Sequence, residues 1–200
     1  MHQKYDSASY TQENLDSVQH LAKVVIISPF QFNTKEERRQ YLILRYKTRK
    51  VWPYAVLAAK RLETLRSRLD SLDTKKEKAA YTRRVQRFME DEFKDQLKKL
   101  TRTEGQILVK LLYRQTGDST FDIIKDLRSG FRAFRYNLTA GVFTISLKRE
   151  YDPLEVKEDY IIEHILQWAF QHNQLEKQDS AIEIDYEELM EKWGNQDLFD

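Results

Sequence analysis

The residues of this sequence that best fit a chemical task are clustered lysines and arginines, and the task is anion binding. Between residues 125 and 135 basic side chains recur at helical spacing, so a helix would carry them on one stripe: Lys125, Arg128, Arg132 and Arg135. A guanidinium group binds phosphate or carboxylate through two parallel hydrogen bonds. The stripe therefore predicts an anion-binding surface, while a solvated face or a dock for the acidic end of the chain are alternative interpretations.

A second basic patch combines cations with aromatic neighbours. Its cations are Arg45, Lys47, Arg49 and Lys50, and the rings of Tyr46 and Trp52 lie beside them in the sequence. Aromatic rings next to cations can stack on nucleic-acid bases while the cations neutralise phosphate. The patch predicts an anionic partner, although an exposed basic helix turn is the simpler interpretation.

The residues around His164 are the candidates for metal binding or catalysis. His164 and His172 are eight positions apart, about two helical turns, and Asp159 and Glu163 supply carboxylates nearby. This spacing matches no zinc-protease motif, and the chain contains neither a glycine-rich phosphate loop nor a clear Ser-His-Asp order. We therefore expect no catalytic residue, metal or cofactor, with a hydrolase site near His164 as the least favoured alternative.

The formal net charge of +2 conceals a strong polarity along the chain. Residues 35–149 carry 29 Lys and Arg against 14 Asp and Glu, whereas residues 150–200 carry 3 against 15. The corresponding net charges are +15 and −12. A basic body with an acidic end indicates either an anionic partner or an end that covers the body.

Composition restricts the class of protein. The 200 residues, 40% of them hydrophobic, suffice for one domain with a core. The scarcity of Gly (5) and Pro (3), with 33% charged residues, favours long helices. The absence of cysteine excludes disulfides, thiolate metal sites and cysteine nucleophiles. No run approaches the length of a transmembrane segment, and the first residues lack the apolar stretch of a signal peptide.

Helix starts are predicted by three capping boxes, in which a Thr side chain and a later Glu or Gln satisfy each other's backbone amides. They are Thr34–Glu37, Thr74–Glu77 and Thr103–Gln106. The first helix should run towards Leu72. It should bend or break between Arg49 and Ala55, because Pro53 has no amide hydrogen.

Apolar periodicity predicts further helices over 119–138, 155–171 and 185–193. Short strands are expected at most at 23–28, 142–147 or 182–184. The fold class is therefore all-α or mainly α, a helical domain of five or more helices with at most short peripheral strands. We divide the chain into a mobile polar arm (1–20), a helical domain (21–172) and an acidic C-terminal extension (173–200) that docks reversibly on the basic body.

Four ordered motifs resemble a bacterial family classed only as a domain of unknown function. They are Lys50-Val51-Trp52-Pro53-Tyr54-Ala55, residues 100–106, residues 127–134 and residues 147–153. The similarity covers about residues 20–166 and brings no assigned activity or catalytic residue. Members of the family look like secreted or envelope proteins, so the resemblance implies a periplasmic or secreted location. The cytoplasm is the alternative, because the sequence given carries no signal peptide.

These observations favour a non-catalytic helical module that binds a macromolecular partner or an anionic surface in the bacterial envelope. A nucleic-acid-binding protein is the alternative. The predicted binding residues are Arg45, Lys47, Arg49, Lys50, Lys125, Arg128, Arg132 and Arg135. We also expect at least one ion pair between these residues and residues 150–200. The sequence does not indicate an oligomeric state.

Overall fold

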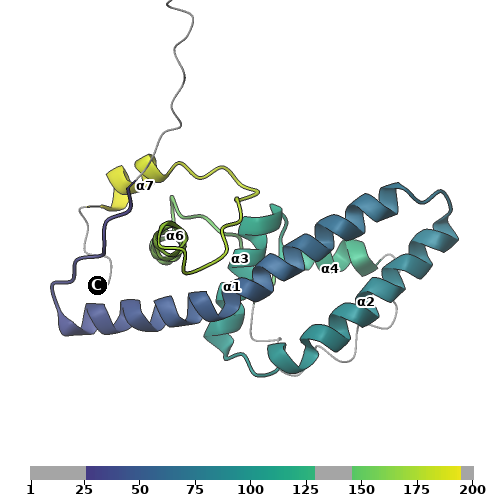
Figure 1. Cartoon of the computed structure of the whole chain (residues 1–200), viewed down its shortest axis with the longest axis horizontal. Helices are drawn as coiled ribbons and strands as arrows, with labels where there is room; N and C mark the ends of the chain where they lie inside the picture. The colour runs from purple at the N-terminus through teal and green to yellow at the C-terminus, as the bar shows by residue number, and fades with distance from the viewer. Residues whose placement is uncertain (1–25, 129–145, 195–200) are drawn as a thin grey trace, which may run out of the picture.

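The computed structural model describes residues 26–128 and 146–194, apart from the side chains of 86, 89–94, 96 and 126–128. Within these ranges the elements are all helices (Figure 1): α1 (Lys35–Asp70), α2 (Lys75–Leu97), α3 (Arg102–Thr116), α4 (Thr120–Arg128), α6 (Lys157–Gln171) and α7 (Tyr186–Trp193). The described ranges contain no strand, so the predicted helical fold class is confirmed. The expected polar arm at 1–20 and the expected strand residues 23–25 and 142–145 lie outside them.

The longest element is α1, which begins where the first capping residue predicts. Thr34 Oγ1 accepts a hydrogen bond from the Glu37 amide at 3.1 Å. Pro53 lies near the midpoint of the helix, and Figure 1 shows α1 changing direction there without a break. Val51, Trp52 and Ala55 are at most 1% exposed, so core contacts on both sides of the proline hold the bent helix together.

The capping prediction is right for α2 and wrong for α3. Thr74 and the Glu77 side chain bond each other's amides at 3.2 Å, as expected. At α3, however, the cap is Thr101, whose amide donates to Glu104 Oε2 at 2.8 Å. Glu104 can reach back to the cap only from the third position of the helix. The helix therefore starts before Thr103, and Thr103 Oγ1 instead accepts from Lys47 Nζ at 2.8 Å.

A tight turn connects α3 to α4. Gly117 ends α3 with φ 73°, the left-handed conformation that glycine adopts without steric cost. Ser119 Oγ then accepts from the Asp122 amide at 3.1 Å, which starts α4 as predicted. The remainder of the helix expected over 119–138 lies outside the described residues after Arg128.

The core is built around α6, of which ten of fifteen residues are buried. One cluster joins α1, α3 and α6 and contains Val51, Trp52, Ala55, Val56, Ile107, Leu108, Leu111, Tyr151, Ile162, Leu166 and Phe170. A second joins α1, α6 and α7 and contains Ile27, Tyr41, Tyr160, Ile161, Ile165, Tyr186, Leu189 and Trp193. Helix α6 thus contributes buried residues to both clusters of the core.

Beyond the core, α2 runs back beside the second half of α1. Figure 1 shows these two helices as a hairpin, here called the arm (residues 60–97), with α4 drawn between them. Ion pairs of Lys60 with Glu176 and of Arg66 with Asp118 connect the arm to the rest of the molecule. Leu65 of α1 is 3% exposed and thus buried within this part of the molecule. The Arg61 guanidinium also lies 5.0 Å from the centroid of the Phe88 ring. Most of the described polar side chains of the arm face solvent.

Residues 173–193 return across the core. Residues 182–184, where at most a short strand was expected, form no strand, and Ile182 and Ile184 pack against the core. Trp52 Nε1 donates to the Glu176 carbonyl at 3.0 Å, and Trp193 Nε1 donates to the Pro153 carbonyl at 3.0 Å. The division of the chain at residue 172 stays a prediction, although side chains from both sides of it share one core.

Candidate partner-binding surface

A buried ion pair fixes α3 against α6. Arg114 Nε and Nη2 donate to Glu163 Oε2 and Oε1, both at 2.8 Å, and the two side chains are 2% and 0% exposed. Glu163 also accepts from Tyr151 Oη and from Gln167 Nε2, each at 2.8 Å. Burial alone would raise the pKa of Glu163, but the hydrogen bonds and charge of Arg114 outweigh it and lower the pKa. The carboxylate is therefore ionised, and both of its oxygens accept hydrogen bonds from protein side chains.

A second buried pair lies one helical turn away. Lys110 Nζ is 2.6 Å from Asp159 Oδ1 and 2.5 Å from Glu158 Oε2. Asp159 Oδ2 accepts from the Asp152 amide at 3.0 Å. Burial raises the pKa of Asp159 more than the Lys110 ammonium lowers it. These groups bond one another across α3 and α6, so they position the core.

The residues near His164, considered above as a possible metal or hydrolase site, interact with other groups of the protein. His164 is 4% exposed, its Nε2 lies 2.9 Å from the Ser28 carbonyl oxygen, and its ring packs 4.2 Å from that of Phe30. Burial lowers the pKa of His164 to about 4, so the ring is neutral at pH 7. His172 bonds the Trp168 carbonyl instead. Among the described residues no three His, Cys, Asp or Glu side chains are grouped to hold a metal ion.

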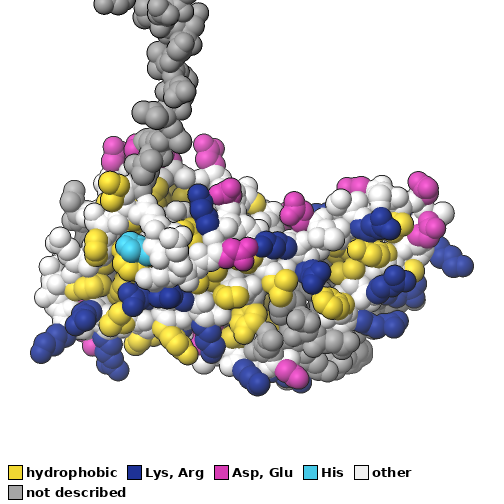
Figure 2. Space-filling model, in the orientation of Figure 1, with side chains coloured by type: hydrophobic (Ala, Val, Ile, Leu, Met, Phe, Trp, Pro, Cys, Tyr) yellow, Lys and Arg dark blue, Asp and Glu magenta, His cyan; other side chains and the backbone are white. Residues whose placement is uncertain are grey.

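The outward side of α1 carries cations around an apolar centre. We call this the α1 outer face, and its residues follow helical spacing: Lys35, Arg38, Arg39, Leu42, Ile43, Tyr46, Arg49 and Lys50. Leu42, Ile43 and Tyr46 are 40%, 44% and 66% exposed. Figure 2 shows apolar and basic side chains side by side along the lower margin, where α1 runs.

The opposite side of α1 holds this face in place. Thr48, Val51, Trp52 and Ala55 are at most 1% exposed, because α1 packs there against α3 and α6. The helix therefore cannot rotate to bury Leu42, Ile43 and Tyr46 in its own core. The outer face is a fixed feature of the fold.

The structure divides the predicted 45–50 patch. Arg49 and Lys50 lie on the α1 outer face, whereas Arg45 and Lys47 lie on its flanks. Arg45 bonds Tyr41, and Lys47 bonds Thr103. Lys50 Nζ also forms an ion pair of 2.8 Å with Glu104 Oε1. Burial raises the pKa of Glu104 less than Lys50 and Thr101 together lower it, so this pair ties α1 to the start of α3.

The predicted stripe on α4 is only partly within the described residues. Lys125 is exposed, the Arg128 backbone ends α4, and Arg132 and Arg135 lie outside. In the described part of the chain neither predicted cluster pairs with residues 150–200. The ion pairs between the basic body and those residues come from Lys60, Lys110 and Arg114. These three cations lie where α6 and the returning segment pack on the body.

Sequence reasoning missed Lys35, Arg38, Arg39, Leu42 and Ile43, whereas Tyr46 was noted as an aromatic neighbour of the 45–50 patch. Their signal was present, since the residues of the outer face recur three or four positions apart. The other side of α1 is also apolar, however, and the pattern alone does not decide which side enters the core. None of the described helices is both long enough and apolar enough to cross a membrane.

One of the comparisons with known proteins identifies a family. A family model described as a domain of unknown function (DUF4294) matches residues 15–168. Neither the curated proteins nor the solved structures give a match to this chain. Two of the four sequence motifs contact each other, because Lys50 pairs with Glu104, and Tyr151 of a third motif bonds Glu163 on α6. The motif residues described here thus stabilise the packing of α1, α3 and α6.

Proposed function

We propose that this chain, which belongs to the DUF4294 family, is a non-catalytic helical module that binds an anionic macromolecular partner or surface through the α1 outer face. One observation carries the proposal: three exposed apolar side chains lie between two groups of cations on a single fixed helix face. A bacterial-envelope location is part of the proposal and rests on the family resemblance.

The apolar centre of the outer face, Leu42, Ile43 and Tyr46, supports binding because exposing apolar side chains to water is unfavourable in free energy. Fully burying a Leu or Ile side chain contributes about 1.5–3 kcal/mol. Leu42 and Ile43 forgo roughly half of this in the free protein, since they are 40% and 44% exposed. Single exposed apolar residues are common on protein surfaces, whereas adjacent ones mark interaction sites more often. A partner that covers them recovers the missing stabilisation.

The surrounding cations support an anionic partner. The outer face carries five cations and no carboxylate of its own: Lys35, Arg38, Arg39, Arg49 and Lys50. Because Lys50 is paired with Glu104, four of these cations remain to attract an anionic partner. Arg39 forms a 3.6 Å ion pair with Glu36 on its flank, but both side chains are more than 60% exposed. Such an exposed pair contributes only about 0–1 kcal/mol, so Arg39 can exchange Glu36 for a negative group of the partner at little cost.

Nucleic-acid binding is the second candidate, and the arm is the observation that favours it. Residues 60–88 carry ten cations against four carboxylates. Arg83, Arg84 and Arg87 are exposed there. Phosphate contacts of this kind give sequence-independent affinity that falls steeply with salt.

The two surfaces can be separated with matched charge reversals. Arg38→Glu with Arg39→Glu changes the α1 outer face, and Arg83→Glu with Arg84→Glu changes the arm by the same charge. On a heparin column, the outer-face variant should elute at clearly lower salt than the arm variant. Equal elution of the two variants would overturn the proposal, because binding would then follow net charge alone. A larger loss for the arm variant would favour the second candidate.

A further inference from the structure

Building on the proposed function, we infer that the partner of the α1 outer face is an anionic phospholipid bilayer surface. The helix lies flat on the surface, with its apolar centre towards the acyl chains and its cations among the headgroups. The inference deepens the proposed function, because it names the class of surface that the same residues recognise.

The order of residues along α1 fits a bilayer surface. Lys35, Arg38 and Arg39 form a basic turn, Leu42, Ile43 and Tyr46 follow, and Arg49 and Lys50 form a second basic turn. At a rise of 1.5 Å per residue, the face is about 22 Å long. Interfacial helices place apolar side chains below the headgroups and cations among them. Anionic headgroups attract each cation that comes close to the surface.

The chemistry of the centre favours lipid over nucleic acid. Leu42 and Ile43 can neither donate to a phosphate nor stack on a base, because they have no polar hydrogen and no ring. They are stabilised only by leaving water, which the boundary between headgroups and acyl chains allows. Tyr46 suits the same boundary, since its ring is apolar and its hydroxyl remains hydrated.

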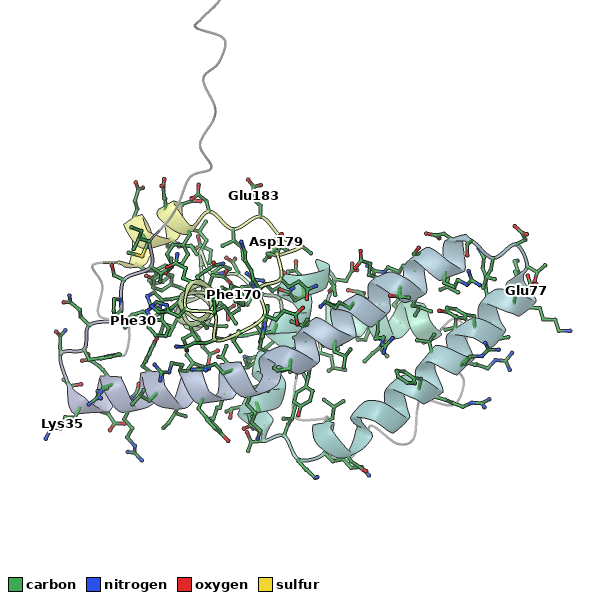
Figure 3. All side chains as sticks on the ribbon, in the orientation of Figure 1. Phe30, Lys35, Glu77, Phe170, Asp179 and Glu183 are labelled. Carbon is green, nitrogen blue, oxygen red and sulfur yellow. The ribbon has the colours of Figure 1, made fainter. Side chains whose placement is uncertain are left out.

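The position of the face on the molecule also suits a flat surface. Figure 3 shows Lys35 at the lower left end of α1, with its side chain pointing away from the body. Figure 2 shows the basic and apolar side chains of this region along one outer margin of the molecule. The helix is already formed and packed through Val51, Trp52 and Ala55. Binding therefore needs no folding of α1, unlike binding by a disordered peptide.

The test is sedimentation of the full chain with vesicles. One set contains phosphatidylcholine alone, and the other contains about a third anionic phosphatidylglycerol. We expect binding to the anionic vesicles only. Leu42→Ser with Ile43→Ser should weaken that binding by about tenfold or more, while heparin retention stays unchanged. Tyr46→Ser, a single change at an exposed position, is the second variant if the double variant loses helicity by circular dichroism.

The outcomes separate this inference from the proposed function. If neither vesicle set binds the chain, or if the serine variants bind anionic vesicles as wild type does, the inference is wrong. The proposed function then stands if heparin still distinguishes the outer-face and arm charge reversals. Tighter binding to duplex DNA than to anionic vesicles at equal phosphate and salt would also overturn the inference in favour of nucleic acid.

Discussion

Replacing Glu163 by Gln tests whether the buried ion pair holds α3 against α6. The carboxylate accepts from Arg114, Tyr151 and Gln167 and is 0% exposed. Gln has nearly the same shape, so the change removes the charge without opening a cavity. It also places an amide NH₂ group against a guanidinium that can only donate. The perturbation is therefore electrostatic, and the Arg114 charge is left buried without a counter-charge.

The expected loss follows from the burial of the pair. Removing one partner of a buried pair costs about 3–5 kcal/mol, since the remaining charge stays out of water. We expect about 3 kcal/mol for Glu163→Gln, because the amide oxygen still accepts one hydrogen bond. For a chain of this size each kcal/mol corresponds to about 2–4 °C in Tm. The loss in Tm should thus be about 6–12 °C.

The same substitution at Glu176 is the control. Lys60 and Glu176 are only 2.6 Å apart, but their side chains are 50% and 68% exposed. An exposed pair contributes about 0–1 kcal/mol, so Glu176→Gln should change the free energy of unfolding by less than about 1 kcal/mol. The two variants make the same chemical change, and burial is the main difference between their ion pairs.

Urea unfolding at neutral pH, followed by circular dichroism, measures both variants against the wild type. A shift in midpoint with an unchanged slope reports a change in stability. A loss at Glu163 no larger than the loss at Glu176 would refute the reasoning. Arg114→Met in the Glu163→Gln background should recover part of the loss, because it removes the uncompensated charge.

Two further predictions concern pH and helix capping. Burial lowers the pKa of His164 to about 4, against about 6.5 in an unfolded chain. The unfolded chain binds the proton more readily, so stability should fall by up to about 3 kcal/mol as pH drops from about 6.5 to 4. In the His164→Phe variant the urea midpoint should depend less on pH between about 6.5 and 4. If the midpoint of this variant falls with pH as steeply as that of the wild type, His164 is not the cause. Thr101→Ala should cost about 1 kcal/mol by removing the α3 cap, whereas Thr103→Ala should cost less than about half of that. Equal losses in urea unfolding would contradict the assignment of the cap.

Local signals predicted two of the three capping-box helix starts, whereas features that depend on tertiary contacts were harder to predict. Thr34 and Thr74 cap their helices through hydrogen bonds that span three residues, so the sequence was sufficient for them. The alternation of Ile182 and Ile184 indicates an extended chain with one side buried, and a strand is only one such arrangement. The helical fold class was therefore predictable, and the role of the 182–184 segment was not.

The candidate surface was predictable only in part. Arg49 and Lys50 belong both to the predicted patch and to the α1 outer face. Leu42 and Ile43 did not stand out, because α1 is apolar on two sides and only its packing on α3 and α6 decides which side is buried. Arg114 and Glu163 are 49 residues apart in sequence, and no local periodicity connects residues so distant. The sequence therefore indicated that the surface is positively charged, but not which residues it includes.

The return of the acidic C-terminal segment across the core has a consequence for how the molecule approaches a partner. Figure 2 shows most visible carboxylates along the upper margin, and Figure 3 labels Asp179 and Glu183 in that upper part, whereas the outer face of α1 follows the lower margin. Opposite charges held on opposite sides give the protein an electric dipole. Near a negatively charged body the field exerts a torque that turns α1 forward before contact. Screening limits this torque to about the last 8 Å at physiological salt. If the proposed function holds, the rate of productive encounter with an anionic partner should depend partly on charges that never touch that partner.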